Sequence, residues 1–144
     1  MTRQEICDLM NRNPVFFLAT LEGQQPRVRG MLLYRADENG IVFHTGTFKE
    51  VYAQIMQNPR VELCFNDFKQ GIQLRVSGEL ELLDDKDLKD EISQHPSRKF
   101  LRDWKESGNL QEFYDQFAVF QLQPVQASVW TMDKNFTGKE NIQM

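Results

Sequence analysis

Apolar residues alternate with polar ones along several short segments of this chain, and the clearest alternation runs from Ile72 to Leu83. Apolar side chains occupy every second position through Leu74 and Val76, and the pattern resumes after Gly78. An alternation with a period of two residues is typical of a strand that buries one face. Gly78, in the middle of this segment, indicates a bulge or bend of the kind that lets a sheet curl into a barrel.

Six further segments have the length and composition of strands and are bounded by turn signals. The turn Asp37–Gly40 contains an Asn-Gly pair, which tolerates positive φ and favours a hairpin between its neighbours. Pro124 separates the last two segments. The predicted strands are Val15–Leu21, Arg27–Arg35, Ile41–Thr45, Val61–Asn66, Ile72–Leu83, Phe117–Leu122 and Val125–Trp130.

Three segments show the spacing of helices instead. Thr2 and Glu5 form a capping box before the first of them. His95-Pro96-Ser97 and Ser107-Gly108-Asn109 divide the last one into shorter helices. The predicted helices are Arg3–Arg12, Phe48–Gln57 and, with these two breaks, Lys86–Gln116. The polar segment Asp133–Met144 is expected to fray.

The order of these elements predicts the fold class. Short turns between successive strands favour antiparallel pairing, and the late helices form an insertion before the last two strands. We therefore expect a mainly β protein, a six- or seven-stranded antiparallel split β-barrel with helices outside it. A chain of 144 residues is the size of one domain, which we place at residues 1–144.

Composition excludes several classes of function. The chain has 17 Lys and Arg against 21 Asp and Glu, a net charge of −4, whereas a nucleic-acid partner favours a basic face. No apolar run approaches the roughly 20 residues of a membrane helix. The segment Met1–Glu5 is charged where a signal peptide would be apolar, so we expect a cytoplasmic protein. Cys7 and Cys64 are far apart and are expected to be free thiols.

Familiar catalytic motifs are missing from the sequence. His44 and His95 have no metal-ligand spacing, so we expect no metal site. His44 ends a strand, where a hydrogen-bonded structural histidine and a functional one are both open readings. The eleven Phe and two Trp residues fit either an aromatic core or a site for a planar ligand.

Basic residues gather at one place in the predicted sheet. Arg27 and Arg29 share a strand face, and Lys49 follows the Thr45-Gly46 end of the neighbouring strand. An arginine fork and the start of a helix both suit a phosphate group. The alternative is that these are solvated charges on an exposed sheet face.

Two segments of the sequence also resemble a known family, in the order and spacing of their elements. They are PRVRGMLLYRADENGIVFHTGTFKEVYAQIMQNPRVELCF, residues 26–65, and IQLRVSGELELL, residues 72–83. Together they are similar to the pyridoxamine 5'-phosphate oxidase-like family of FMN-binding split barrels. The resemblance covers residues 15–83 and implies FMN as cofactor, although a deazaflavin would fit the same phosphate-type cluster.

The resemblance also implies roles for individual residues. Arg29 matches the position that contacts the flavin phosphate, and Lys49 lies in the segment with further phosphate-binding residues. Gln73 matches a glutamine that reaches the flavin from the other subunit of a homodimer, and Trp130 matches a late tryptophan. The implied cofactor-binding residues are Arg29, Gly30, Met31, Leu32, His44, Thr45, Lys49, Gln73 and Trp130.

The chain also departs from the enzyme that names the family. Glu50-Val51 stands where that enzyme has an Arg-Lys pair, and the segment Val129–Met144 has no arginine-rich signature. The chain therefore looks more like the short general-stress-type branch than like a pyridoxamine phosphate oxidase.

The sequence leaves three functions open and identifies no catalytic residues. The first is an FMN-dependent oxidoreductase acting on an unidentified small molecule, in which the cofactor supplies the redox chemistry. The second is a flavin- or haem-binding module without turnover, related to stress. The third is an interaction protein that keeps the barrel without a ligand.

Overall fold

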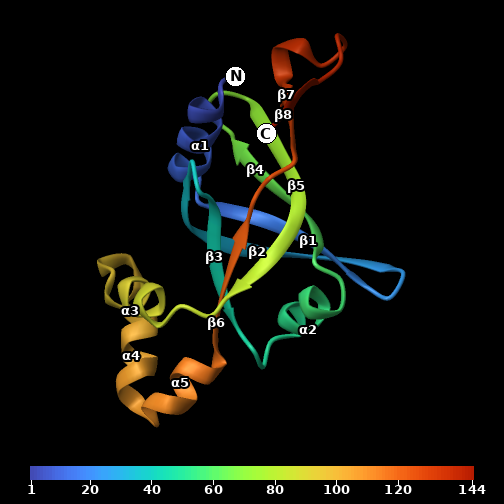
Figure 1. The fold of residues 1–144 in the computed structure, drawn as a ribbon. Coiled ribbons are helices and arrows are strands. Elements are labelled where there is room, and N and C mark those ends of the chain that lie inside the picture. Colours follow the sequence, from blue (N-terminus) through green and yellow to red (C-terminus); the bar gives the residue numbers. More distant parts are fainter.

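The strands of this protein close into a barrel, as Figure 1 shows for the computed structural model, which describes residues 1–144. The neighbours around the barrel are, in order, β4, β1, β2, β3, β6 and β5, and β5 pairs with β4 to complete the ring. All these pairs are antiparallel. The strands are β1 (Val15–Glu22), β2 (Gln25–Asp37), β3 (Gly40–Gly46), β4 (Arg60–Asp67), β5 (Ile72–Leu83), β6 (Phe117–Leu122), β7 (Gln126–Thr131) and β8 (Glu140–Gln143).

The long strand β5 changes its partner along one edge, and this splits the barrel. Residues Leu80–Leu83 pair with β6, whereas Ile72–Ser77 pair with β7. The change occurs at Gly78, where an added Cβ would lie only 2.9 Å from the carbonyl oxygen of Gln123. The expectation of an antiparallel split barrel is therefore confirmed, and Gly78 lies at the split.

The C-terminal segment differs from the expectation. Residues 133–144 were expected to fray, but β8 pairs with β7, with Ile142 opposite Ala127. The N-terminal amine also bonds the carboxylate of Glu140 at 3.0 Å, so the two ends of the chain meet. The expectation was wrong because backbone pairing with a distant strand holds a segment that has little apolar content of its own.

Five helices surround the barrel. Two of them, α1 and α2, stand apart in sequence from the other three. Helix α1 carries the predicted capping box of Thr2 and Glu5 and packs Ile6, Leu9 and Met10 into the barrel core. Helix α2 begins at Glu50 instead of Phe48, because the N–H of Lys49 donates to the Gly46 oxygen in a turn. The helices are α1 (Arg3–Arg12), α2 (Glu50–Gln57), α3 (Lys86–Gln94), α4 (Lys99–Ser107) and α5 (Leu110–Gln116).

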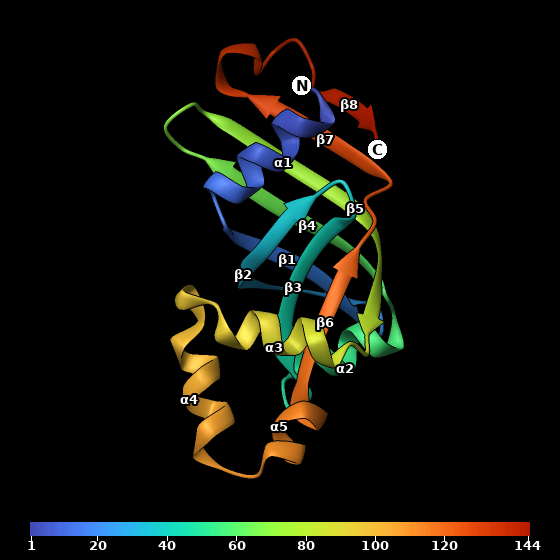
Figure 2. The same cartoon turned by 60° about the vertical axis from the view of Figure 1, so that its left-hand side comes forward.

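The three late helices form a group at one end of the barrel, opposite the two termini (Figures 1 and 2). They bury their own small core against the outer face of β3 and β6. Its members are Val42, Ile92, Leu101, Phe113, Phe117 and Val119. This second core fixes α4 beside the ends of β2 and β3, where the candidate site lies. None of the helices is long and apolar enough to cross a membrane.

Candidate functional site

Seven of the nine residues implied by the resemblance line one pocket of about 580 Å³. The pocket, here called the β2–α4 pocket, is bounded by β2, the end of β3, the start of α2 and one face of α4. The seven residues are Arg29, Gly30, Met31, Leu32, His44, Thr45 and Lys49. They come from three separate elements, which the turn after Gly46 and the second core bring to one place.

Arg29 is held at the pocket by bonds within the chain. Its Nη1 donates to the Leu18 oxygen at 3.1 Å and to the Thr20 hydroxyl at 2.7 Å. Its Nη2 donates to Oε1 of Gln54 at 2.5 Å. Burial lowers the pKa of Arg29, and the charge of Glu50 partly offsets this. The Nε–H and one Nη2 hydrogen have no partner in the chain and form the side edge of the guanidinium fork, so they remain free for an anion.

Lys49 is the second cation of the pocket and is exposed. It forms no ion pair and occupies the N-cap position of α2, where no side chain caps the helix. The first N–H groups of a helix are free to bind an anion, and the helix dipole favours one there. Arg29 and Lys49 therefore bring two cations to the pocket, where they could bind an anion. Arg27 is absent from it, because its guanidinium pairs with Glu22 at 2.9 Å near the β1–β2 turn.

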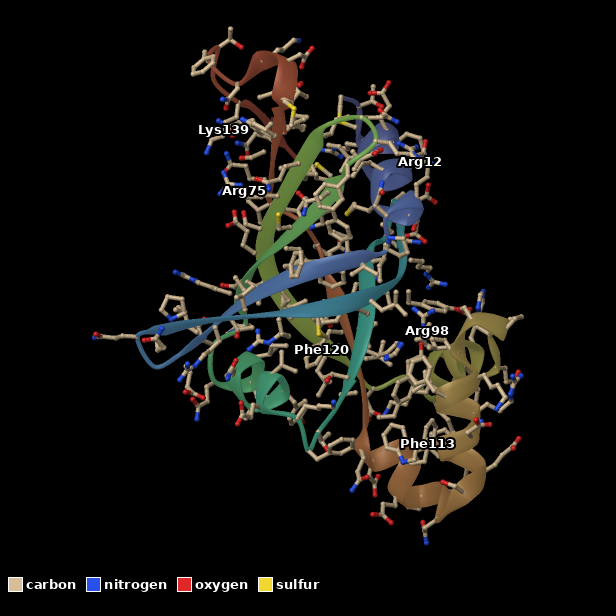
Figure 3. The ribbon with its side chains drawn as sticks, turned by 180° about the vertical axis from the view of Figure 1, so that it is seen from behind. Arg12, Arg75, Arg98, Phe113, Phe120 and Lys139 are labelled. Carbon is tan, nitrogen blue, oxygen red and sulfur yellow. The ribbon has the colours of Figure 1, made fainter.

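His44 lies in the wall of the pocket and contacts a buried arginine. The Nε of Arg98 lies 3.1 Å from the Nε2 of His44. Burial, followed by the charge of Arg98, lowers the pKa of His44 to about 4, so the imidazole is neutral at pH 7. Figure 3 shows Arg98 between the late helices and the barrel.

Aromatic side chains for which the sequence predicted no role in a site also line the pocket. They are Phe48, Phe100, Trp104 and Phe117. Phe100 and Trp104 are one helical turn apart on α4, a spacing that sequence alone could only assign to the packing face of a helix. Arg98 had no local signal at all, because its importance comes from contacts with His44 and Leu33 in distant strands.

Gln73 and Trp130 lie elsewhere in the molecule. They face each other across β5 and β7 and line a smaller pocket of about 230 Å³ with Arg75, Ser128 and Lys139. Figure 3 shows Arg75 and Lys139 at the end of the barrel away from Arg98. Within one chain, these two residues are therefore not brought to the β2–α4 pocket. The second pocket is here called the β5–β7 pocket.

Two further expectations concern cysteines and metals. Cys7 and Cys64 are both free, and no cluster of three or more His, Cys, Asp or Glu side chains could hold a metal ion. Burial is the main cause of a raised pKa at both thiols. These thiols are consequently less reactive than an ordinary exposed cysteine.

Comparison with known proteins gives one family match. A family model described as pyridoxamine 5'-phosphate oxidase matches residues 2–131 of this chain. The pyridoxine/pyridoxamine 5'-phosphate oxidase of Allorhizobium ampelinum is 28% identical over 85 residues, 59% of this chain and 41% of the relative. The protein of the same name from Agrobacterium fabrum is 23% identical over 159 aligned positions, 94% of this chain and 77% of the relative. The match thus spans about two fifths of the first relative's length.

Solved structures show the same fold at low sequence identity. A NimC/NimA family protein of Clostridium acetobutylicum has a TM-score of 0.75 and 22% identity, covering 99% of this chain and 93% of that one. A protein of that organism related to general stress protein 26 has a TM-score of 0.75 and 13% identity, covering 100% and 97%. A pyridoxamine 5'-phosphate oxidase-related, FMN-binding protein of Nostoc punctiforme has a TM-score of 0.64 and 22% identity, covering 96% and 87%.

Proposed function

Because this chain belongs to the pyridoxamine 5'-phosphate oxidase-like family of FMN-binding split barrels, we propose that it binds FMN in the β2–α4 pocket and acts as an oxidoreductase on a small molecule. The observation that carries the proposal is the pocket itself, in which seven residues implied by the family resemblance come together. When bound, FMN would supply the redox chemistry, so the protein needs no catalytic acid or base of its own.

The residues present fit the phosphate of FMN. Arg29 keeps one edge of its guanidinium free, and Lys49 has no carboxylate partner, so both can bind phosphate oxygens. The uncapped start of α2 adds backbone N–H groups. Glu50 lies in the first turn of α2 and opposes an anion, which makes the phosphate site weaker than one with a basic pair there.

The ring of FMN also has suitable surroundings. Gly30 has open space on its side-chain side, since an added Cβ there would meet nothing within 4 Å. Met31 and Leu32 continue the same strand with half-buried apolar side chains. These residues would bind a flat apolar ring and exclude water from one of its faces.

The substrate is proposed to differ from that of pyridoxamine phosphate oxidase. The segment Val129–Met144 contains no arginine, and its two lysines, Lys134 and Lys139, are exposed. A substrate phosphate is best recognised by a bidentate arginine fork, which this segment does not offer. We therefore propose that this chain functions as a member of the general-stress-type branch.

We also propose a homodimer with a shared flavin site. In one chain, Gln73 and Trp130 lie in the β5–β7 pocket, at a distance from Arg29 along the barrel. A second copy could present its β5–β7 pocket to the β2–α4 pocket of the first. This arrangement would unite all nine residues that the family resemblance implies.

A titration with FMN and riboflavin tests the phosphate assignment, because riboflavin has the same ring without the phosphate. Replacing Arg29 or Lys49 by alanine should weaken FMN binding about tenfold to a hundredfold, since a hydrogen bond to a charged group contributes roughly 1.5–3 kcal/mol. Arg29→Lys should recover part of the loss, because lysine keeps the charge without the fork. The measurement is the quenching of flavin fluorescence as protein is added.

Two controls distinguish the loss of a phosphate contact from a loss of folding. Arg27→Ala removes a cation that pairs with Glu22 outside the pocket and should affect both affinities much less. Riboflavin affinity should stay constant in the Arg29 and Lys49 variants, because only the phosphate contact is lost. Equal losses for FMN and riboflavin would mean that Arg29 only supports the fold, and unchanged FMN affinity in both variants would refute the assignment.

A further inference from the structure

A cavity of about 650 Å³ lies outside both pockets described above, where the end of α1 meets the loop between β4 and β5. It shares no lining residue with the β2–α4 pocket or with the β5–β7 pocket. Figure 3 shows Arg12, which lines it, toward the end of the barrel that holds Arg75 and away from Arg98. This cavity, here called the α1–β4 cavity, is lined by Arg12, Asn13, Asp67, Phe68, Lys69 and Gln70.

Asp67 brings a carboxylate oxygen without a hydrogen bond to this cavity. The residue is only 6% exposed, and its Oδ1 accepts from the N–H of Gln70 at 3.1 Å. Its Oδ2 lies 4.0 Å from Nη2 of Arg12, which is too far for a hydrogen bond. The one fully enclosed polar side-chain atom without a partner is Nε of Arg35, so Oδ2 of Asp67 is open to the cavity. A largely buried carboxylate oxygen without a donor is unfavourable, and a donor entering the cavity would stabilise it.

Asn13 offers a second acceptor at the C-terminal end of α1. Its Nδ2 donates to the Leu9 oxygen at 2.9 Å, which leaves its Oδ1 without a partner in the chain. The dipole of a helix also favours a positive charge at this end. Asp67 and Asn13 therefore suit a ligand with an ammonium group.

Two cations stand at the same cavity. The side chain of Arg12 is 54% exposed, and its long contact with Asp67 is its one ion pair. Lys69 is exposed and forms no ion pair. A guanidinium with free N–H groups and a free ammonium group both bind carboxylates. The cavity therefore presents groups of both charges side by side.

We propose that the α1–β4 cavity binds a free α-amino acid, whose ammonium group donates to Oδ2 of Asp67 and whose carboxylate accepts from Arg12. An α-amino acid carries both charges on one carbon, which fits two side-chain atoms only 4.0 Å apart. A simple anion or cation would be attracted by one of these side chains and repelled by the other. Phe68 is 87% exposed, and an apolar or aromatic side chain of the ligand would cover its ring. This site is separate from the proposed flavin site and does not depend on it.

Three probes with the same aromatic ring distinguish the two charges. L-phenylalanine has both, phenethylamine has only the ammonium group, and 3-phenylpropionate has only the carboxylate. Isothermal titration calorimetry on the full chain at neutral pH, with and without added FMN, would measure their affinities. L-phenylalanine should bind about tenfold more tightly than either of the other probes, whether or not FMN is present.

Two substitutions should divide the probes. Asp67→Asn keeps an Oδ1 acceptor for Gln70 but removes the charge, so L-phenylalanine and phenethylamine should bind about tenfold more weakly and 3-phenylpropionate should not. Arg12→Ala should weaken L-phenylalanine and 3-phenylpropionate by about threefold to tenfold and should not weaken phenethylamine. Arg60→Ala is the matched control, because its guanidinium pairs with Glu79 at the other end of β4, outside the cavity, and it should change none of the three affinities.

Three results would overturn the inference. The first is L-phenylalanine that binds no more tightly than the probes with a single charge. The second is a loss of affinity in Arg12→Ala or in folded Asp67→Asn that is the same for all three probes. The third is L-phenylalanine that is displaced by FMN, which would place it in the β2–α4 pocket. Because Arg12 is exposed, Arg12→Ala tests the site even if Asp67→Asn does not fold.

Discussion

At the scale of single residues, Arg29 shows how one side chain can serve both the fold and the site. Its partners Thr20 and Gln54 are buried, and the Thr20 hydroxyl also donates to Gln54 at 2.6 Å. Gln54 in turn donates to Glu22 at 3.2 Å, so the guanidinium ends a polar chain that crosses from β1 to α2. This preorganisation reduces the entropy that Arg29 would lose on binding an anion.

His44 predicts a pH dependence of stability. The pKa of His44 is lowered from 6.5 to about 4 in the folded protein. Below pH 6.5, His44 therefore binds a proton in the unfolded chain but not in the folded one. The free energy of unfolding should therefore fall as the pH drops from 6.5 towards 4, by at most about 1.4 kcal/mol per pH unit. Urea denaturation of wild type and His44→Gln at several pH values would measure this, and the variant should lack the slope.

Asp90 does not produce the same effect in this range. Hydrogen bonds from Lys105 and Tyr114 lower the pKa of Asp90 to about 2, so its contribution is lost only below its ordinary value of 3.8. An equal slope in wild type and His44→Gln between pH 5 and 6.5 would contradict the environment described for His44.

Some residues of the site could be predicted from the sequence and others could not. Arg29, Thr45 and Lys49 were identified because they stand next to turn and strand signals in a familiar order. Arg98 and Phe100 were missed, because they belong to an insertion whose local pattern indicates only helices. Their place at the pocket depends on how the second core docks α4 on the barrel, which is a long-range property.

At the scale of elements, Gly78 is the position that allows β5 to serve two sheets. A Cβ at this position would also lie 2.9 Å from Cδ1 of Leu122, besides its contact with the Gln123 oxygen. Gly78→Ala should therefore destabilise the fold by about 1–3 kcal/mol, the usual range for overpacking. Urea denaturation followed by circular dichroism would measure the difference.

A second glycine provides the matched control. Gly108 lies between α4 and α5, and an added Cβ there would meet nothing within 4 Å. Gly108→Ala should leave the stability nearly unchanged, because it also has no positive φ to accommodate. Equal stability of the two variants would show that β5 does not need a glycine where it changes its partner.

Elements with a strong local pattern were predicted well and the others were not. The alternation from Ile72 to Leu83 gave β5 with its observed ends, and the Thr2–Glu5 box gave the start of α1. Helix α2 begins two residues later than predicted, since the turn after Gly46 uses Phe48 and Lys49. Strand β8 has only Ile142 as an apolar residue, so it forms through pairing with β7 and not through a pattern of its own.

At the scale of the whole molecule, short turns and alternating strands were sufficient to predict an antiparallel barrel. The order of strands around it was not, because the pairs β1–β4 and β3–β6 join segments separated by helices. The same limit applies to the site. The resemblance implied nine residues, and a single chain divides them between the β2–α4 and β5–β7 pockets.

The central claim is an FMN site completed by two copies of the chain, and sedimentation velocity of the protein mixed with FMN tests it most directly. The run would be followed both in the protein absorbance and in the visible flavin band, at micromolar protein concentration. The account predicts that flavin sediments with a species of two chains, at one FMN per chain. Flavin that stays behind as free FMN would contradict the cofactor assignment, and flavin that sediments with a single chain would contradict the shared site.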